Sequence, residues 1–328
     1  MTRLRTLHIR RGTDADLPAI LALLADSLGW RRDEQHEALF TWKHRANPFG
    51  PSMMWLGFDG GRLIGLRTLV RWQFVHAGRV QRAVRAVDTA THPDYQGQGI
   101  FTRLTLHALE ELEHDDVAFV FNTPNDQSRP GYLKMGWQVV GRLPVVVRPT
   151  SPVGLAKMVS ARTAAERWSI PTSTGVAAEE ALADRGALER LLKSRPPSPG
   201  MATNVSADFL IWRYASHPID YRAVVARDGP HAGLVIFRVR RRGRSRELVL
   251  CDVIAEGGDE QREQDLIRRL TREADANHLI ALDRRVVSRT GFVRLPRQGP
   301  LLTSKPIKGG ALQPLREWNL TLGDVEVF

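Results

Sequence analysis

The sequence predicts an α/β fold with a mixed sheet, present in two tandem copies, and three observations support this prediction. Apolar residues recur at helical spacing in some segments and alternate with polar residues in others, as in amphipathic helices and half-buried strands. Two turns that contain glycine separate alternating segments early in the chain and indicate antiparallel hairpins. Short segments also recur in the same order in the two halves. With 328 residues the chain is too long for one small core, so two domains are expected.

The first half is expected to begin with a strand and a helix, followed by an antiparallel meander. Thr13 or Asp14 caps the helix, which comes after a strand over residues 4–10. Asp59-Gly-Gly predicts a hairpin between strands over 53–58 and 63–70, and a second turn at His76 leads into a strand over 84–91. The next elements are expected to be a helix over 101–112, a strand over 117–122, a loop and helix up to 135, and a strand over 137–147.

The second half repeats landmarks of the first half in fixed order. Trp42 aligns with Trp212 in one register with Pro48 and Pro218. The further matches are Asp88 with Asp252, Arg103-Leu-Thr with Arg269-Leu-Thr, and Gly136-Trp with Gly291-Phe. These matches predict a duplicated domain. We expect a first domain in residues 1–150, a linker with a helix in residues 151–174, and a second domain in residues 175–328.

The net charge of +11 indicates an anionic ligand or partner. The candidates are nucleic acid, an anionic surface, or a polyphosphate cosubstrate. The densest basic run, residues 238–249, alternates around a glycine turn and is typical of a solvated hairpin tip, so nucleic acid is the least favoured partner. Cys251 is the only cysteine, which excludes an intramolecular disulfide and a cysteine-based zinc site. The opening residues lack a signal peptide and no segment resembles a membrane span, so we expect a cytoplasmic protein with no membrane partner.

The most informative segment is the turn between the strand over 84–91 and the following helix. Gly97 and Gly99 lie in this turn and would let the backbone approach a ligand closely. The free amides of the first helical turn favour a phosphate there. The segment lacks the third glycine of a dinucleotide fingerprint and the Gly-Lys-Ser/Thr of a P-loop. It therefore predicts an anion site of another kind, with a simple helix-starting turn as the structural alternative.

Two blocks of sequence resemble the GNAT superfamily of acyl-CoA-dependent N-acetyltransferases. Gln96-Gly-Gln-Gly-Ile-Phe101 is similar to the family's Arg/Gln-x-x-Gly-x-Gly/Ala signature, except that Phe101 replaces a small residue. Asn125-Asp-Gln-Ser-Arg-Pro-Gly-Tyr132, followed by Gly136-Trp137, is similar to the family's Asn-x-x-Ala/Ser-x-x-x-Tyr block and Gly-Phe/Trp pair. The resemblance covers residues 7–147 and reaches the second half only through the internal repeat. It implies a GNAT-like fold and acetyl transfer from acetyl-CoA to an amine by direct attack, and no metal is expected.

The resemblance also implies roles for individual residues. Thr89, Ala90 and Thr91 would present backbone groups to the pantetheine arm of CoA. The pyrophosphate would be held by Gln96, Gly97, Gln98, Gly99, Ile100 and Phe101. Asn125 would steady the pantetheine or the following helix, and Tyr132 would protonate the departing thiolate of CoA. For Tyr132 the structural alternative is a packed aromatic ring.

Asp88 is the candidate general base, acting directly or through water. Asp252 occupies the matching place in the second copy, which favours a structural role for both residues. His92 is a weaker candidate because a histidine before a proline is suited to capping the turn. Water alone is the remaining alternative.

The second copy is expected to be degenerate. Its counterpart of the glycine turn, residues 255–267, carries five acidic residues that would repel a pyrophosphate. It would instead complete the core, wall off a substrate cleft or form a homodimer. Two other functions stay open for the whole chain: a non-catalytic acyl-CoA sensor or interaction protein, and a basic nucleic-acid-binding protein. The sequence identifies neither the amine acceptor nor the oligomeric state.

Overall fold

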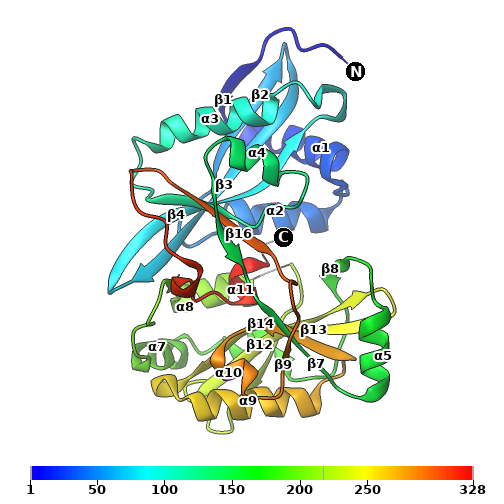
Figure 1. Ribbon diagram of the computed structural model, residues 1–328, viewed down its shortest axis with the longest axis vertical. Coiled ribbons are helices and arrows are strands. Elements are labelled where there is room, and N and C mark those ends of the chain that lie inside the picture. Colours follow the sequence, from blue (N-terminus) through cyan, green and yellow to red (C-terminus); the bar gives the residue numbers. More distant parts are fainter. Residues whose placement is uncertain (1, 217, 327–328) are drawn as a thin grey trace. The chain divides into compact units, whose positions relative to one another are not determined.

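The computed structural model describes residues 2–216 and 218–326 (Figure 1). The chain divides into two compact units that exchange segments. The first unit comprises Met1–Gly141 and Leu301–Leu315, and the second comprises Arg142–Pro300 and Arg316–Phe328. No helix in the described ranges is both long enough and apolar enough to cross a bilayer.

The first unit is built on one mixed sheet. Its strands are β1 (His8–Arg11), β2 (Met53–Asp59), β3 (Arg62–His76), β4 (Arg79–Thr91), β5 (Phe119–Asn122), β6 (Gln138–Arg142) and β16 (Leu301–Pro306). They lie in the order β1-β2-β3-β4-β5-β16-β6. The pairs from β1 to β4 are antiparallel, whereas β5 runs parallel to β4. The predicted hairpins at Asp59 and His76 are thus confirmed.

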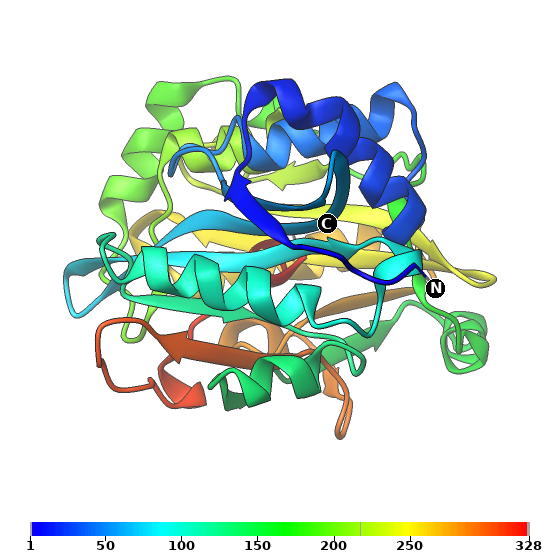
Figure 2. The ribbon, with the colours of Figure 1, turned by 90° about the horizontal axis from the view of Figure 1, so that it is seen from above.

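Helices cover both faces of this sheet. They are α1 (Leu17–Leu28), α2 (Glu34–His44), α3 (Ile100–Leu112) and α4 (Arg129–Lys134). Figure 2 shows α1 and α2, in blue, on one face and α3 on the other. The side chains of Ile100, Leu104 and Ala108 recur every four residues along α3 and join the core beneath it. Asp33 caps α2 by accepting a hydrogen bond from the backbone N–H of His36.

The second unit repeats this architecture. Its strands are β7 (Val145–Pro149), β8 (Ala165–Ser169), β9 (Val176–Ala177), β10 (Ala202–Thr203), β11 (Arg222–Val225), β12 (Gly233–Arg242), β13 (Ser245–Ala255), β14 (His278–Leu282) and β15 (Val293–Arg294). Its helices are α5 (Pro152–Ser160), α6 (Ala178–Ala181), α7 (Arg185–Ser194), α8 (Ala207–Leu210), α9 (Glu260–Glu273), α10 (Arg285–Ser288) and α11 (Leu322–Val325), with a π-helical turn at Ile211–Ala215. The sheet order is β15-β7-β14-β13-β12-β11-β9, and β8 also pairs with β12.

Corresponding elements confirm the prediction of a mixed fold in two copies. In each unit a long antiparallel hairpin, β3–β4 or β12–β13, leads through a helix to a strand that runs parallel to the hairpin's second strand. Each hairpin also contains a β-bulge. In the first unit Arg67 lies opposite both Asp88 and Thr89, because Leu66 pairs with Ala90 and Thr68 pairs with Val87. The bulge of the second unit lies at Cys251, next to Asp252.

Each half contributes a strand to the sheet of the other half. β16, from near the end of the chain, lies between β5 and β6 in the first sheet. β7, which directly follows β6, lies between β14 and β15 in the second sheet. The single strand expected over 137–147 is therefore two strands, separated at Leu143-Pro144, where proline has no N–H to continue a ladder. The compact units divide at residue 141, and residues 151–174 contain both α5 and the sheet strand β8.

Candidate active site

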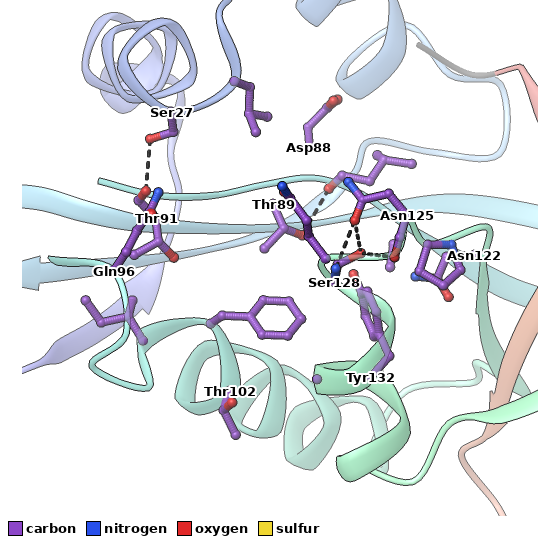
Figure 3. Close-up of a pocket in the computed structure, with 18 of the residues that line it drawn as sticks. Ser27, Asp88, Thr89, Thr91, Gln96, Thr102, Asn122, Asn125, Ser128 and Tyr132 are labelled. Atoms are coloured by element: carbon purple, nitrogen blue, oxygen red, sulfur yellow. Dashed lines mark hydrogen bonds between the residues drawn. The ribbon is translucent and has the colours of Figure 1, made fainter. Parts of the chain in front are cut away.

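A cavity of about 720 Å³ lies in the first unit beyond the last paired residues of β4 and β5. The ladder between these strands ends at Arg85 and Phe121. Past that point the end of β4, the start of α3 and the segment 122–132 line the cavity (Figure 3). A crevice at the end of adjacent parallel strands is a common ligand site in α/β proteins.

The glycine turn forms one part of the cavity wall. Gly97 and Gly99 have φ values of 74° and 75°, which favour glycine, and Gly99 is the N-cap residue of α3. No side chain caps this helix. Gly97, Gly99 and Ile100 line the cavity and a Cβ atom placed on Gly99 would meet nothing within 4 Å, so the turn opens into the cavity. This arrangement suits an anionic group at the helix N-terminus.

Most of the residues predicted for the site line this cavity. They are Asp88, Thr89, Thr91, Gln96, Gly97, Gly99, Ile100, Phe101, Asn125 and Tyr132. Ala90 and Gln98 do not. The Ala90 side chain is 2% exposed and belongs to the core. The Gln98 side chain accepts from the N–H of Leu4 and donates to the carbonyl of Thr2, so it ties down the start of the chain.

Phe101 contacts Tyr132 across the cavity wall. The two rings make an edge-to-face contact with their centroids 5.3 Å apart. A Cβ atom at Gly131 would lie 2.8 Å from Phe101 Cε1, so a side chain at position 131 would press against the Phe101 ring. The glycine on α4 leaves room for Phe101, which departs from the small residue of the GNAT signature.

Tyr132 and Asn125 line the part of the cavity wall that lies opposite the glycine turn. The Tyr132 side chain is 4% exposed, and its Oη accepts a hydrogen bond of 2.7 Å from Arg67 Nη1. Asn125 Oδ1 accepts from the N–H and the hydroxyl of Ser128 at 2.8 and 2.9 Å (Figure 3). Asn125 thus fixes the turn that leads into α4.

Asp88 is held by two side chains of α2. Asp88 has a φ of 43°, a rare backbone conformation for a residue other than glycine, and lies in the bulge of β4. Its Oδ2 lies 2.7 Å from Lys43 Nζ and 3.0 Å from His44 Nε2. Burial alone would raise the pKa of Asp88, but the Lys43 ammonium and the His44 contact outweigh burial and hold this pKa well below its usual range. Burial lowers the pKa of His44. Asp88 is therefore an ionised, paired carboxylate and a weak base.

The repeated aspartate has an equivalent contact in the second unit. Tyr214, which aligns with His44, donates its hydroxyl to Asp252 Oδ2. In both units the residue two positions after the repeated tryptophan thus contacts the aspartate beside the bulge. This parallel supports a structural contribution from Asp88.

The glycine turn of the second unit is covered. The backbone N–H of Gly257 donates to Ser194 Oγ at 2.9 Å. A Cβ atom on Gly258 would lie 2.7 Å from Pro196 Cδ, so the segment after α7 lies directly against the turn. Ser194 Oγ thus accepts a hydrogen bond from a backbone N–H of this turn. The open turn of the first unit leaves such an N–H available to a ligand.

Several cavity residues were not predicted. Ser27 donates to the carbonyl of Thr91 at 3.1 Å, and Asn122 Oδ1 accepts from Thr303 Oγ1 of β16 at 2.6 Å. Neither contact has a local signal, because each joins segments far apart in sequence. Arg67, which lies behind the cavity wall, does have a local signal in the sequence, because it is a charged residue within the apolar run of residues 63–70. Among the described residues, no group of three or more His, Cys, Asp or Glu side chains is arranged to hold a metal ion.

Known acetyltransferases are similar to this chain in part of its sequence and in its fold. Residues 8–140 match the family model described as an acetyltransferase (GNAT) domain. A GCN5-related N-acetyltransferase from Anabaena variabilis is similar in structure, with a TM-score of 0.63 and 12% identity over 92% of this chain and 73% of that chain. The corresponding values for a GCN5-related N-acetyltransferase from Kribbella flavida are 0.60 and 15%, over 92% and 71% of the two chains.

A putative acetyltransferase from Pyrococcus horikoshii matches over 100% of this chain and 97% of its own, with a TM-score of 0.55 and 12% identity. No curated protein matches the sequence. At these identities the solved structures show the fold alone, and their coverage extends over both units.

Proposed function

Because the chain carries a GNAT acetyltransferase domain in residues 8–140, we propose that it transfers an acetyl group from acetyl-CoA to a primary amine by direct attack. The observation that carries this proposal is the cavity wall of the first unit. It joins an open, uncapped helix N-terminus at Gly99 to a buried tyrosine, Tyr132, along the bulged end of β4. These features suit a long donor with an anionic end and a thioester end.

The start of α3 would hold the pyrophosphate of CoA. The amides after Gly99 have no side-chain cap, and the positive end of the helix dipole favours negative charge. Thr89 and Thr91 lie along the wall and would present backbone groups to the pantetheine arm. Holding the donor and the amine side by side supplies much of the acceleration that a direct transfer needs.

Tyr132 would act as the general acid. The amine nitrogen attacks the thioester carbonyl carbon, the carbon–sulfur bond breaks, and Tyr132 gives its proton to the departing sulfur. The amine loses a proton, which we assign to water because the lowered pKa of Asp88 makes that carboxylate a weak base. No covalent intermediate on the protein is required.

The second unit would leave CoA unbound. Ser194 and Pro196 cover its glycine turn, and the start of α9 carries Glu260 and Glu263 in its first turn. Calorimetry with CoA should therefore give one site per chain. Two equivalent sites would contradict the assignment of a degenerate copy.

The test of the function is thiol release from acetyl-CoA across a broad panel of amines. Release that depends on the amine supports the proposed reaction. CoA binding without turnover of any amine would favour the acyl-CoA sensor. If the protein binds nucleic acid with an affinity that falls steeply with salt, and does not bind CoA, a nucleic-acid-binding function would be favoured.

A further inference from the structure

Arg67 is a charged side chain in the middle of the buried strand β3. It lies opposite the bulge of β4, and 1% of the residue is exposed. Its Nη1 atom donates to Thr89 Oγ1 and to Tyr132 Oη, at 2.7 Å in each case. Its Nε and Nη2 atoms are buried and have no hydrogen-bond partner among the described residues. Within the same residues no carboxylate pairs with the guanidinium.

A buried guanidinium without a carboxylate partner destabilises the fold, so we expect such a charge where it has a function. Burying a guanidinium without a counter-charge destabilises a protein, and an apolar side chain of similar volume would avoid that cost. Arg240 in the second unit shows the usual solution, because its guanidinium pairs with Glu247 and Glu326. Arg67 instead directs its one hydrogen-bonding nitrogen at two groups of the cavity wall.

We infer that Arg67 is a positioning residue for Tyr132 in acyl transfer, an inference that rests on the proposed function. A guanidinium has donors and no acceptor, so Tyr132 Oη must accept from it. The proton of the phenol then points away from Arg67, toward the cavity that Tyr132 lines. Arg67 thereby fixes the direction in which the acid presents its proton.

The hydrogen bond from Arg67 also stabilises the phenolate that forms when Tyr132 loses its proton. When Tyr132 gives its proton to the departing sulfur, the resulting phenolate already has a charged N–H donor in place. The phenolate then regains a proton from water, so the site returns to its starting state. The rings of Phe101 and Tyr132, with centroids 6.0 and 5.3 Å from the guanidinium carbon, help to hold the cation there.

A double-mutant cycle on kcat tests this inference. The variants are Arg67→Met, Tyr132→Phe and the pair together, assayed with acetyl-CoA and an amine that the wild type turns over. Arg67→Met should lower kcat roughly 10- to 100-fold, while the KM for acetyl-CoA and the Kd for CoA change by less than about threefold. In the Tyr132→Phe background the same change should alter kcat by less than about twofold, because there is no acid left to position.

A control and two further substitutions separate chemistry from folding. Arg222 of the second unit donates to the carbonyls of Thr174 and Gly175, both at 2.6 Å, so Arg222→Met should lower the Tm and leave kcat unchanged. If Arg67→Met does not fold, Arg67→Gln and Arg67→Lys replace it in the cycle. Gln keeps a donor without the charge and Lys keeps both, so Lys should retain more kcat than Gln.

The outcomes distinguish the two proposals. If the Arg67 and Tyr132 effects multiply in an active enzyme, or if Arg67→Met changes only the Tm, the inference about Arg67 is wrong and the function stands. A wild type that turns over no amine overturns the proposed function and this inference with it.

Discussion

The Tyr132 hydroxyl accepts a hydrogen bond from Arg67, and the Tyr132 ring contacts the rings of Phe101 and Trp137. Replacing it with phenylalanine keeps this packing and removes the acidic proton. We expect Tyr132→Phe to lower kcat by roughly 10²-fold, the usual scale for a positioned acid, with little change in the Kd for CoA. Steady-state kinetics and calorimetry on one preparation measure both. A lower Tm with a normal kcat would make Tyr132 a structural residue.

Asp88 is more firmly held than Tyr132, because Lys43 and His44 both contact its Oδ2. Lys43 is fully buried, so Asp88→Asn would remove the carboxylate that pairs with a buried ammonium. We expect this change to lower the free energy of unfolding by about 3 kcal/mol, the scale for breaking a buried ion pair. The kcat of the folded variant should fall less than about tenfold. A fall of 10²-fold or more with unchanged stability would instead identify Asp88 as the base.

At the scale of elements, α3 and α9 each follow a turn that contains glycine, but one turn is open and the other is covered. Gly99 and Gly257 both have positive φ, and a Cβ atom on either would meet nothing within 4 Å. The turn at Gly257 is covered by Ser194, whereas the turn at Gly99 opens into the cavity. Gly99 is the N-cap of α3, and Gly257 lies two residues before Asp259, the N-cap of α9, so the two glycines allow the same substitution at positive φ in an open and in a covered turn.

We expect Gly99→Asp to abolish CoA binding, because it places a side chain and a negative charge where the amides of α3 would meet the pyrophosphate. Gly257→Asp should leave CoA affinity within about twofold of wild type. Calorimetry on both variants, with Tm values to confirm folding, measures the difference. Equal losses of affinity would show that the phosphate site is elsewhere.

The elements that the sequence predicts well are those with local signals. The hairpin turns at Asp59 and His76, the glycine turn and the apolar face of α3 follow from neighbouring residues. Most of the predicted cavity residues follow from the two blocks that resemble the GNAT family. The pairing of β16 with β5 could not be predicted, because nothing within residues 301–306 specifies a strand some 180 positions earlier. Arg67 has a local signal, a charge within the apolar run of residues 63–70, but its role could not be predicted because its partner Tyr132 lies 65 residues away.

At the scale of the whole molecule, the second unit contains two interacting carboxylates, the buried Asp324 and the partly buried Asp252. Burial and the nearby Asp324 raise the pKa of Asp252 to about 6, and burial raises the pKa of Asp324 as well. A carboxyl group whose pKa is higher in the folded protein than in the unfolded chain stabilises the fold at low pH. That contribution is lost as the pH rises through the folded value.

We therefore expect the wild type to lose stability relative to Asp252→Asn as the pH rises from about 4 to about 7, by roughly 1–3 kcal/mol. Asparagine keeps an acceptor for the Tyr214 hydroxyl and does not titrate. Urea unfolding of both proteins across this range measures the difference. A difference that is independent of pH would contradict the raised pKa of Asp252.

The exchanged strands also bear on how the protein is made. The first sheet receives β16 between β5 and β6, and Thr303 of that strand holds Asn122 in the cavity wall. A ribosome synthesises residues 119–142 long before residues 301–306 emerge. During that interval the edges of β5 and β6 that later pair with β16 have no strand from the chain itself, and such edges promote association with other chains. The nascent first unit is therefore incomplete until residue 306 has been translated, which makes the pace of translation and protection by chaperones part of how its active site is assembled.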